Sequence, residues 1–513
     1  MGIKSIYDST LTAIADAIRA KDGSSGTYTP LEMPQAIEDI PTGGGLEEKD
    51  VNFYDYDGTL LYSYTAAEFA NITEMPENPT HEGLTSQGWN WDLSDAKSYV
   101  ANWGRLIIGQ SYITDDGATR IYVDLDEYSL EPYLCINING SATIDWGDGS
   151  EEDTVTNNNA NSRNYVQHSY AEPGSYVIKI NPIENTPLII PSSLNSQVYN
   201  SNLLLYANNT TSVDTRYSMA IKKIEIGKNF CWNSGNYGSF ANLQNLETIT
   251  IPADNYVNTV NNHTLQRHFL ECKKLKCLIL PRGILSFKDF AFAVCTNLEI
   301  VSIPQTVTGF TGSNVFSNNS NLKEITVPEF SATNFNQNYP FQNCYSLKRA
   351  IVPSYPNGCF QNCQSLEKVV LTDADNARIL SGAFSTCYSL KEFDMPTTAL
   401  DTNIPSQTLT YNNYIEHLKF PDGFKTVVAS AMSNLRGLKT LTLPPTITSI
   451  NAGGLSNYFS LREFHIMATT PPTLSGAISN FPTTCKIYVP EGSLSAYQTA
   501  TNWSTYASQM EEE

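Results

Sequence analysis

The sequence predicts a mostly β protein with short helices, in which a C-terminal repeat solenoid follows small β-domains and an N-terminal helical segment. Three observations support this: an apolar pattern that recurs through the C-terminal three-fifths, strand-like segments separated by Gly and Pro turns before it, and an amphipathic start. A chain of 513 residues is also too long for one core. The expected domains are a helical segment with a linker, a β-grasp-like module, a β-sandwich and the solenoid, at residues 1–45, 46–125, 126–190 and 191–513.

The chain starts with an amphipathic helix at residues 5–20. Tyr7, Leu11, Ile14 and Ile18 follow a 4-3-4 spacing, which is typical of a coiled-coil stripe. A helix this short is marginally stable in water, so we expect it to pack on copies of itself or on a partner. We therefore predict an attachment or oligomerisation role for these four residues, with a trimer favoured. A self-contained helical hairpin is the alternative.

The pattern Leu-Thr-Ala-Ile-Ala-Asp-Ala-Ile-Arg at residues 11–19, followed by Gly23, Pro30, Met33 and Ile37, resembles the start of many phage tail-fibre and related virion proteins. The resemblance implies that the N-terminus attaches to other virion proteins.

Strand-like segments begin at Val51. Residues 51–54 and 57–59, together with Pro76, Pro79 and Gly88–Trp89, resemble a Listeria–Bacteroides surface repeat, a small β-grasp-like module, although no second copy follows.

One enzyme alternative lies in the same module, because Asp55–Tyr56–Asp57–Gly58–Thr59 matches the DxDGT signature of haloacid-dehalogenase-type phosphatases. In those enzymes the first Asp is the nucleophile and the second is the general acid. That chemistry needs a buried parallel strand before the motif and a doubly wound sheet. The alternating lead-in 49–53 does not predict a fully buried strand, so an Asp-Gly hairpin turn is favoured.

Two segments, residues 144–150 (Ile-Asp-Trp-Gly-Asp-Gly-Ser) and 168–177, resemble a PKD-type (polycystin) β-sandwich. Trp146 and Tyr176 are expected in its core. Asp145 and Asp148 could bind calcium, but carboxylates that accept hydrogen bonds from turn backbone N–H groups need no metal.

The solenoid is predicted from a repeated frame in which an aromatic is followed by apolar residues three, six, nine and eleven positions later, and then by proline. One copy consists of Phe292, Cys295, Leu298, Val301, Ile303 and Pro304. Other copies start at Phe240, Phe269, Phe316, Phe341, Phe384 and Met432, and degenerate copies occupy residues 360–371, 409–421 and 455–466.

The spacing predicts how each copy folds. Positions nine and eleven alternate with polar residues and indicate a short strand, which the proline ends. The segment from the aromatic to the first leucine favours a short helix or 3₁₀ turn. Because one copy cannot bury its own apolar side, the copies are expected to stack, with a C-terminal cap from about residue 469.

The phrases Phe-Gln-Asn-Cys-Tyr-Ser-Leu (341–347) and Phe-Ser-Thr-Cys-Tyr-Ser-Leu-Lys-Glu-Phe (384–393) resemble BspA-type leucine-rich repeats. The ending around residues 487–490, Tyr497 and Trp503 is similar to the end of that family. The resemblance covers about residues 215–510. It implies a binding role, because such proteins are typically surface adhesins for host proteins or glycans, and it supplies no catalytic residues.

The ten cysteines are interpreted as reduced core residues. Five of them lie three residues after the first residue of the frame, and no CxxC pair suggests zinc. They are Cys272, Cys295, Cys344, Cys363 and Cys387.

The net charge of −21 lies entirely in residues 1–200, which hold 30 acidic and 9 basic side chains. Without a basic stripe, nucleic acid is not an expected partner. Neither a secretory signal nor a run of apolar residues long enough for a membrane helix is predicted. No cofactor is expected.

The outward repeat positions are rich in Asn, Ser, Thr, Gln and Tyr, which suit adaptable polar recognition. We predict a ligand face containing Tyr345, Tyr388, Tyr339 and Tyr355, of which the first two follow an inward Cys directly. Covering the core is the alternative role for them.

The leading hypothesis is therefore a non-enzymatic phage tail or head fibre, made in the host cytoplasm and located on the virion, that binds a bacterial surface protein or glycan. The alternatives are a bacterial cell-surface adhesin, a capsid decoration protein and, less favoured, a phosphatase or glycan hydrolase.

Overall fold

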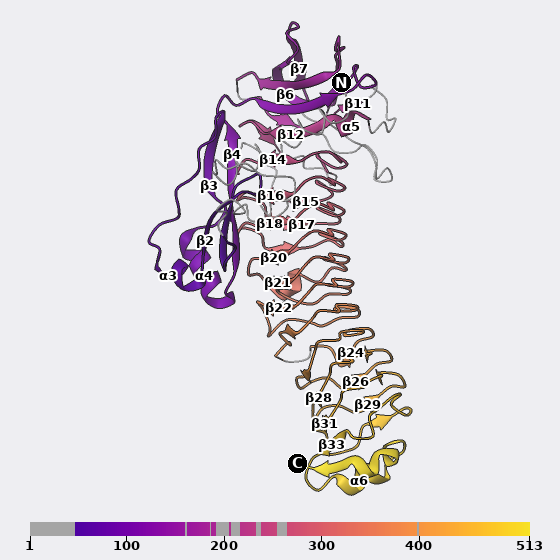
Figure 1. The fold of residues 1–513 in the computed structure, drawn as a ribbon. Coiled ribbons are helices and arrows are strands. Elements are labelled where there is room, and N and C mark those ends of the chain that lie inside the picture. Colours follow the sequence, from indigo (N-terminus) through magenta and orange to yellow (C-terminus); the bar gives the residue numbers. More distant parts are fainter. Residues whose placement is uncertain are drawn as a thin grey trace, which may run out of the picture.

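The computed structural model describes residues 47–159, 162–184, 186–190, 205–206, 216–231, 238–253, 264–397 and 400–513. The predicted N-terminal helix, with Tyr7, Leu11, Ile14 and Ile18, lies outside these residues. The described chain is an elongated solenoid with one β-sheet module at its N-terminal end and a second module along its flank (Figure 1). The prediction of a mostly β protein with a C-terminal solenoid is confirmed.

The flanking module is a mixed sheet in the order β2-β1-β4-β3, with β1 parallel to β4. Its strands and helices are β1 (Val51–Tyr54), β2 (Leu60–Tyr64), α3 (Ala66–Asn71), β3 (Leu84–Trp89), α4 (Leu93–Trp103) and β4 (Leu106–Thr114). Helix α3 starts with a capping box in which Thr65 and Glu68 satisfy each other's backbone N–H groups.

Strand β1 is buried along its whole length, so the expectation of an incompletely buried strand before the DxDGT motif is wrong. Phe53 packs with Phe69 and other side chains of the helical side of the sheet. Tyr54 points to the opposite side and packs with Cys277 and Ile279 of the solenoid. The alternating sequence does not predict this burial, because the solenoid residues that cover the second side of β1 lie more than two hundred positions away in the chain.

The end module is built on a long sheet in the order β13-β10-β6-β9-β5-β12-β14, with β7, β8 and β11 also paired to β6. Its strands are β5 (Thr119–Leu125), β6 (Tyr133–Asp145), β7 (Asp153–Asn158), β8 (Asn164–Gln167), β9 (Gly174–Pro182), β10 (Leu188–Ile189), β11 (Leu205–Tyr206) and β13 (Phe230–Cys231). Strand β5 pairs with β9 throughout and therefore belongs to the end module. The boundary between the two sheets lies at the turn between β4 and β5, before the expected domain boundary at residue 125.

This sheet runs directly into the solenoid. After α5 (Arg216–Ala220), strand β12 (Ile221–Glu225) pairs antiparallel with β5 and parallel with β14 (Thr248–Thr250) of the next coil. The apolar cores of sheet and solenoid form one continuous cluster. The module therefore closes the N-terminal end of the stack, which would otherwise expose an unpaired edge and core side chains.

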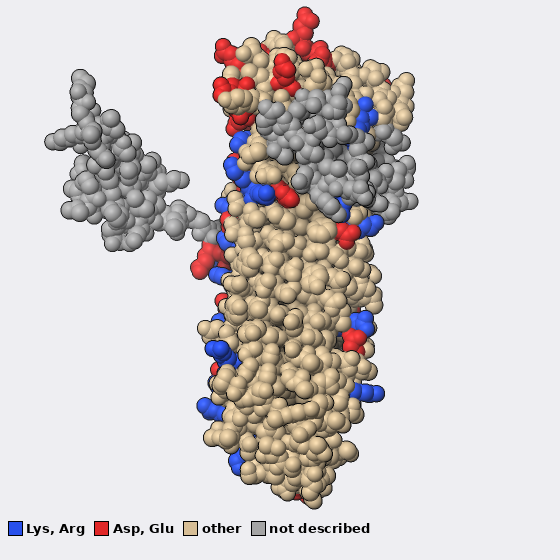
Figure 2. Space-filling view, turned by 90° about the vertical axis from the view of Figure 1, so that its right-hand side faces the viewer, with Lys and Arg blue, Asp and Glu red and all other residues tan. Residues whose placement is uncertain are grey.

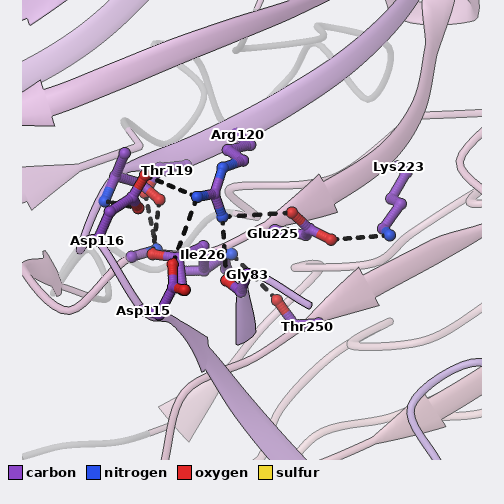
Figure 3. A network of polar contacts seen from close by, with 12 residues as sticks. Gly83, Asp115, Asp116, Thr119, Arg120, Lys223, Glu225, Ile226 and Thr250 are labelled. Atoms are coloured by element: carbon purple, nitrogen blue, oxygen red, sulfur yellow. Dashed lines mark hydrogen bonds and ion pairs between the residues drawn. The ribbon is translucent and has the colours of Figure 1, made fainter. Parts of the chain in front are cut away.

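A polar cluster around Arg120 joins the two modules and the first coil (Figure 3). The Arg120 guanidinium donates to the Gly83 carbonyl (3.2 Å) and to Asp116 (2.6 Å), and it lies 3.6 Å from the Glu225 carboxylate. Lys223 is 2.8 Å from the same carboxylate. Glu225 is buried, so these cations are what compensate its charge.

The solenoid coils stack through a ladder of parallel strands formed at positions eight to eleven of the frame, as predicted, and strand pairing is continuous within β16–β18, β20–β23 and β25–β33. These strands are β16 (Cys277–Ile279), β18 (Ile300–Ser302), β20 (Glu324–Thr326), β21 (Arg349–Val352), β22 (Lys368–Leu371), β23 (Glu392–Phe393), β25 (His417–Lys419), β28 (Thr440–Leu443), β31 (Glu463–Ile466) and β33 (Lys486–Val489). We call the outward surface of this ladder the strand face.

A second ladder lies on another side of the coils. Its strands are β15 (Thr264–Leu265), β17 (Ser286–Phe287), β19 (Gly309–Phe310), β24 (Asn403–Ile404), β26 (Thr426–Val427), β29 (Ser449–Ile450) and β32 (Thr473–Leu474). The frame's first residues stack in the core between the ladders, and neighbouring rings from Phe240 to Phe384 are 4.7–5.8 Å apart.

The first four residues of each frame form a bend, the aromatic turn. The prediction was a short helix or 3₁₀ turn, and the described copies form single turns with i→i+3 hydrogen bonds, for example from Cys344 N to Phe341 O (3.3 Å) and from Leu347 N to Cys344 O (3.1 Å), without extending into a helix. Within the described part of the solenoid, the single 3₁₀ helix before the cap is Ala332–Asn334, outside the aromatic turns. The backbone also pairs coil to coil, for example from Phe292 N to Val315 O (2.9 Å), and one pair of short strands forms where Met432–Ser433 meets Leu455–Ser456.

The third residue of the aromatic turn adopts a left-handed conformation, which explains why it is often Asn. Asn318, Asn343 and Asn362 have φ of 62°, 62° and 64°, a region that Asn tolerates better than most residues. Their amides form a ladder in which each Nδ2 donates to the Oδ1 of the preceding coil, at 2.8 Å in both steps. The same residue therefore ends the bend and ties neighbouring coils together.

The cysteines at the fourth residue of the turn do more than fill space. Each donates its thiol to the carbonyl of the aromatic residue that starts the preceding coil, at 2.9–3.2 Å. Asn319 and Asn412 replace Cys at this position and make the equivalent bond, both at 3.0 Å. The position therefore selects small buried donors.

The last coil is covered by α6 (Leu494–Thr499), a 3₁₀ helix (Trp503–Gln509) and β34 (Met510–Glu512), which pairs with β33. Trp503 and Tyr497 are fully buried and donate to the carbonyls of Pro472 and Ala468, both at 2.7 Å. These aromatic side chains close the C-terminal end of the core.

The thiols supply the first prediction. All ten cysteines are buried thiols outside disulfide bonds, and burial raises the pKa of Cys344 to about 12. We expect almost no reaction with DTNB at pH 8 and ten reactive thiols in denaturant. Because the folded-state pKa of Cys344 lies above the unfolded value of about 8.5, the contribution of this thiol to stability falls as the pH rises through that interval. Rapid reaction of the native chain would contradict this account.

The cluster in Figure 3 supplies the second prediction. Arg120→Met leaves the buried Glu225 with less compensation, so we expect the free energy of unfolding to fall by about 1–3 kcal/mol in urea titrations. Lys222→Met is the matched control, because its pair with Asp124 is exposed and 3.9 Å long, and we expect a loss below about 1 kcal/mol. Equal losses in the two variants would mean that the Arg120 cluster contributes no more to the free energy of unfolding than an exposed ion pair does.

Candidate binding surfaces

The strand face of the first coils is covered by the flanking module. Trp91 Nε1 donates to the carbonyl of Ile303 (2.9 Å), and Tyr99 OH donates to the carbonyl of Val327 (2.7 Å). Arg105 makes a two-pronged contact with Glu324, at 2.7 and 2.8 Å. The face that a solenoid commonly offers to ligands is therefore occupied from β16 to β21.

Beyond the module, the strand face carries ion pairs between neighbouring coils. Lys391–Glu367 and Lys368–Glu392 are each 3.0 Å apart, and Lys439–Glu416 are 2.6 Å apart. These groups are exposed, so each pair contributes little to stability. They do place much of the solenoid's charge on this side.

The surface formed by the second ladder and the aromatic turns is almost free of charge, and we call it the neutral face. Figure 2 shows charged side chains along its borders and few within it, while acidic side chains gather on the end module. Eight segments that form coils here contain no Asp, Glu, Lys or Arg; they are residues 305–322, 330–347, 350–366, 379–390, 402–415, 426–435, 440–461 and 466–485.

The predicted tyrosines divide into exposed and buried residues. Tyr345 and Tyr388 are 42% and 40% exposed, and they lie two coils apart between the neutral face and the strand face. Tyr339 is 38% exposed and lies over Gly358, where a Cβ atom would collide with its ring.

Tyr355 was wrongly assigned to the ligand face, because it is fully buried. Its hydroxyl donates to the carbonyl of Asp394 (2.8 Å), and its ring packs on Phe384. The coil from Phe341 to Phe360 is shorter than its neighbours, which brings Tyr355 into the inward position of the second ladder, where it pairs with Ile379.

Three further exposed aromatics were missed. Tyr411, Tyr414 and Phe459 are 46%, 60% and 60% exposed. Tyr411 is the third turn residue of the degenerate copy that starts at Leu409, Tyr414 follows that turn, and Phe459 corresponds to Tyr345 in the copy that starts at Leu455. Aligning the degenerate copies to the frame could have found them. We call Tyr345, Tyr388, Tyr411, Tyr414 and Phe459 the aromatic edge.

Asp145 and Asp148 have contacts that suit turn formation. Asp145 accepts from Gly147 N (2.8 Å), and Asp148 accepts from Ser150 N (3.0 Å) and contacts His168 Nε2 (2.8 Å). Hydrogen bonds from Ser150 and His168 lower the pKa of Asp148 to about 2 despite partial desolvation. Within the residues described, no group of three or more potential ligands could hold a metal ion.

The DxDGT motif forms a turn in a four-stranded mixed sheet and not in a doubly wound one. Asp57 accepts from Thr59 N (2.9 Å), and buried Asp55 contacts His81 Nε2 (2.7 Å). This arrangement lacks the parallel sheet that the phosphatase alternative requires.

In the parts of the chain that the structure covers, every helix is too short or too polar to cross a bilayer.

The sequence model of the BspA type leucine rich repeat region matches six copies in residues 213–348 and 354–480, just over half of the chain. No curated protein matches the chain.

The solved structures that resemble the chain include three bacterial proteins. A leucine-rich repeat protein from Bacteroides ovatus is 20% identical with a TM-score of 0.35, and the match covers 57% of this chain and 65% of that one. A leucine rich cell surface protein from Faecalibacterium prausnitzii is 15% identical with a TM-score of 0.26, covering 50% and 73%. The pneumococcal vaccine antigen PcpA is 17% identical with a TM-score of 0.28, covering 56% and 73%. TM-scores this low carry no argument about function.

Proposed function

Because the chain belongs to the BspA type leucine-rich repeat family, we propose that it is a non-enzymatic, adhesin-type binding protein displayed on a bacterial surface. Its solenoid is the ligand-binding part. The observation that carries this proposal is the neutral face bordered by the aromatic edge, on a solenoid whose strand face is partly occupied by its own flanking module.

The proposed ligand is a neutral glycan, or a surface protein that presents similar hydrogen-bonding groups. Amide and hydroxyl side chains of the neutral face can donate and accept hydrogen bonds in varied geometries, and exposed tyrosines add contact area at low entropic cost. A face without charges makes binding insensitive to salt, because no ion pairs are screened.

A virion fibre is the second candidate, and a specific observation favours it. Residues 11–19 and the glycine and prolines after them have the pattern of phage fibre N-termini. In this proposal residues 1–45 attach the chain to other virion proteins, with a trimer favoured, and the solenoid performs the same binding role. Gold-labelled antibodies on intact cells and on purified particles separate the two locations.

The third prediction concerns the aromatic edge. Tyr388→Ala combined with Tyr414→Ala removes two exposed rings from neighbouring coils, and we expect about tenfold or greater loss of affinity on an array of neutral oligosaccharides and on intact cells.

Tyr128→Ala is the matched control, because Tyr128 is 65% exposed but lies in the end module. Unchanged circular dichroism and unfolding midpoint show that the double variant folds. Full binding by the folded double variant would reject the aromatic edge as the ligand site.

A further inference from the structure

The strand face opens into a cleft between β23 and β25. In the described residues β23 pairs with β22 alone and β25 with β28 alone. The same two coils stay joined at their aromatic turns, where Phe384 N donates to Thr408 O (2.9 Å) and Thr386 N donates to Thr410 O (2.8 Å). The coils therefore diverge toward the strand face, and the space between them is about 610 Å³.

Both walls of the cleft present unpaired strand edges. Glu392 and Asp394 direct their N–H groups to the carbonyls of Glu367 and Val369 in β22. Because alternate residues direct their backbone groups to opposite edges, those of Phe393 face the cleft. On the other wall, Glu416 bonds toward β28, so the backbone groups of His417 and Lys419 face the cleft.

The floor of the cleft is apolar. Phe393 and Met395 are partly buried against the core, and Ile415 and Leu418 line the same space. Phe393 and Met395 remain partly exposed at this floor, while Ile415 and Leu418 are buried. An apolar side chain in the cleft would remove this surface from water.

The rim carries three lysines, Lys368, Lys391 and Lys419, and two carboxylates, Glu392 and Asp394, which leaves a small positive excess. Lys368 and Lys391 have acidic partners on neighbouring coils, but Lys419 has no ion-pair partner among the residues that the structure describes. Asp394, the acidic residue beside the floor, already accepts a hydrogen bond from Leu371 N (3.0 Å). The remaining charge at the rim therefore favours a carboxylate.

We propose that this cleft binds an extended peptide segment of a partner protein, which adds a strand between β23 and β25, places apolar side chains on the floor and an acidic side chain beside Lys419. An extended peptide is the ligand that satisfies two facing strand edges, since its own N–H and C=O groups alternate in the same way. The site is separate from the neutral face, so it provides a second binding activity.

The test starts from a library of random twelve-residue peptides displayed on phage and selected on the full chain. We expect enrichment of peptides that alternate apolar residues and contain Asp or Glu. In fluorescence anisotropy with an enriched peptide, the double variant Lys391→Glu, Lys419→Glu should bind about tenfold more weakly. Lys486→Glu, a change on the same face beyond the cleft, should bind as the parent does.

Hydrogen exchange tests separately whether the peptide pairs with the strand backbones. Addition of the peptide should slow hydrogen exchange at the amides of Phe393, His417 and Lys419, which exchange quickly in the free chain. Tyr388→Ala with Tyr414→Ala should leave peptide affinity unchanged, which separates this site from the aromatic edge.

Three results would overturn the proposal: no enriched peptide, affinity unchanged in the double lysine variant, or slow exchange of these amides without peptide. Concentration-dependent dimerisation that the double lysine variant loses would assign the cleft to a second copy of the chain instead.

Discussion

Each coil of the solenoid depends on the next coil to complete its core and its backbone hydrogen bonds. A single coil of about two dozen residues has apolar side chains facing a space that it cannot enclose by itself. The side chains repeated in the sequence serve this dependence: stacked rings fill the center, thiols and amides at the fourth turn position reach the preceding coil's carbonyl, and asparagines at the third position link to one another. Small hydrogen-bond donors and left-handed backbone conformations recur in the coils because each coil makes the same contacts with its neighbour.

The same dependence explains the ends and the break. A stack needs a closure wherever a coil lacks a neighbour, and β5 with its sheet provides one at the start, while Trp503 and Tyr497 provide one at the finish. Between β23 and β25 the strand pairing is lost although the turns remain joined, so unpaired backbone edges and partly buried apolar side chains occur together. The flanking module, by covering β16 to β21, leaves the neutral face as the large continuous surface of the rod.

Local repetition made most of the solenoid predictable, and long-range contacts limited the rest. The spacing of Phe292, Cys295 and Leu298 and its copies identified the inward positions, and it correctly placed Tyr345 and Tyr388 on the outside. The spacing predicted a short helix or 3₁₀ turn and could not decide between them, because apolar spacing does not reveal the left-handed third residue that prevents a helix. Tyr355 was misplaced because its coil is short. The contact between Trp91 and Ile303 joins residues 212 apart in the chain, and no local pattern encodes it. The predicted resemblance of the two modules to surface-repeat and PKD-type domains stays a prediction.

The central claim is that ligands bind the neutral face and its aromatic edge, while the strand face from β16 to β21 is closed by the chain's own module. Hydrogen–deuterium exchange of the full chain with and without an oligosaccharide identified on the array tests it most directly. The account predicts slower exchange in residues 384–390 and 409–415 on binding, with no change in β16 to β21. Protection confined to β16 to β21, with none at the aromatic edge, would contradict it.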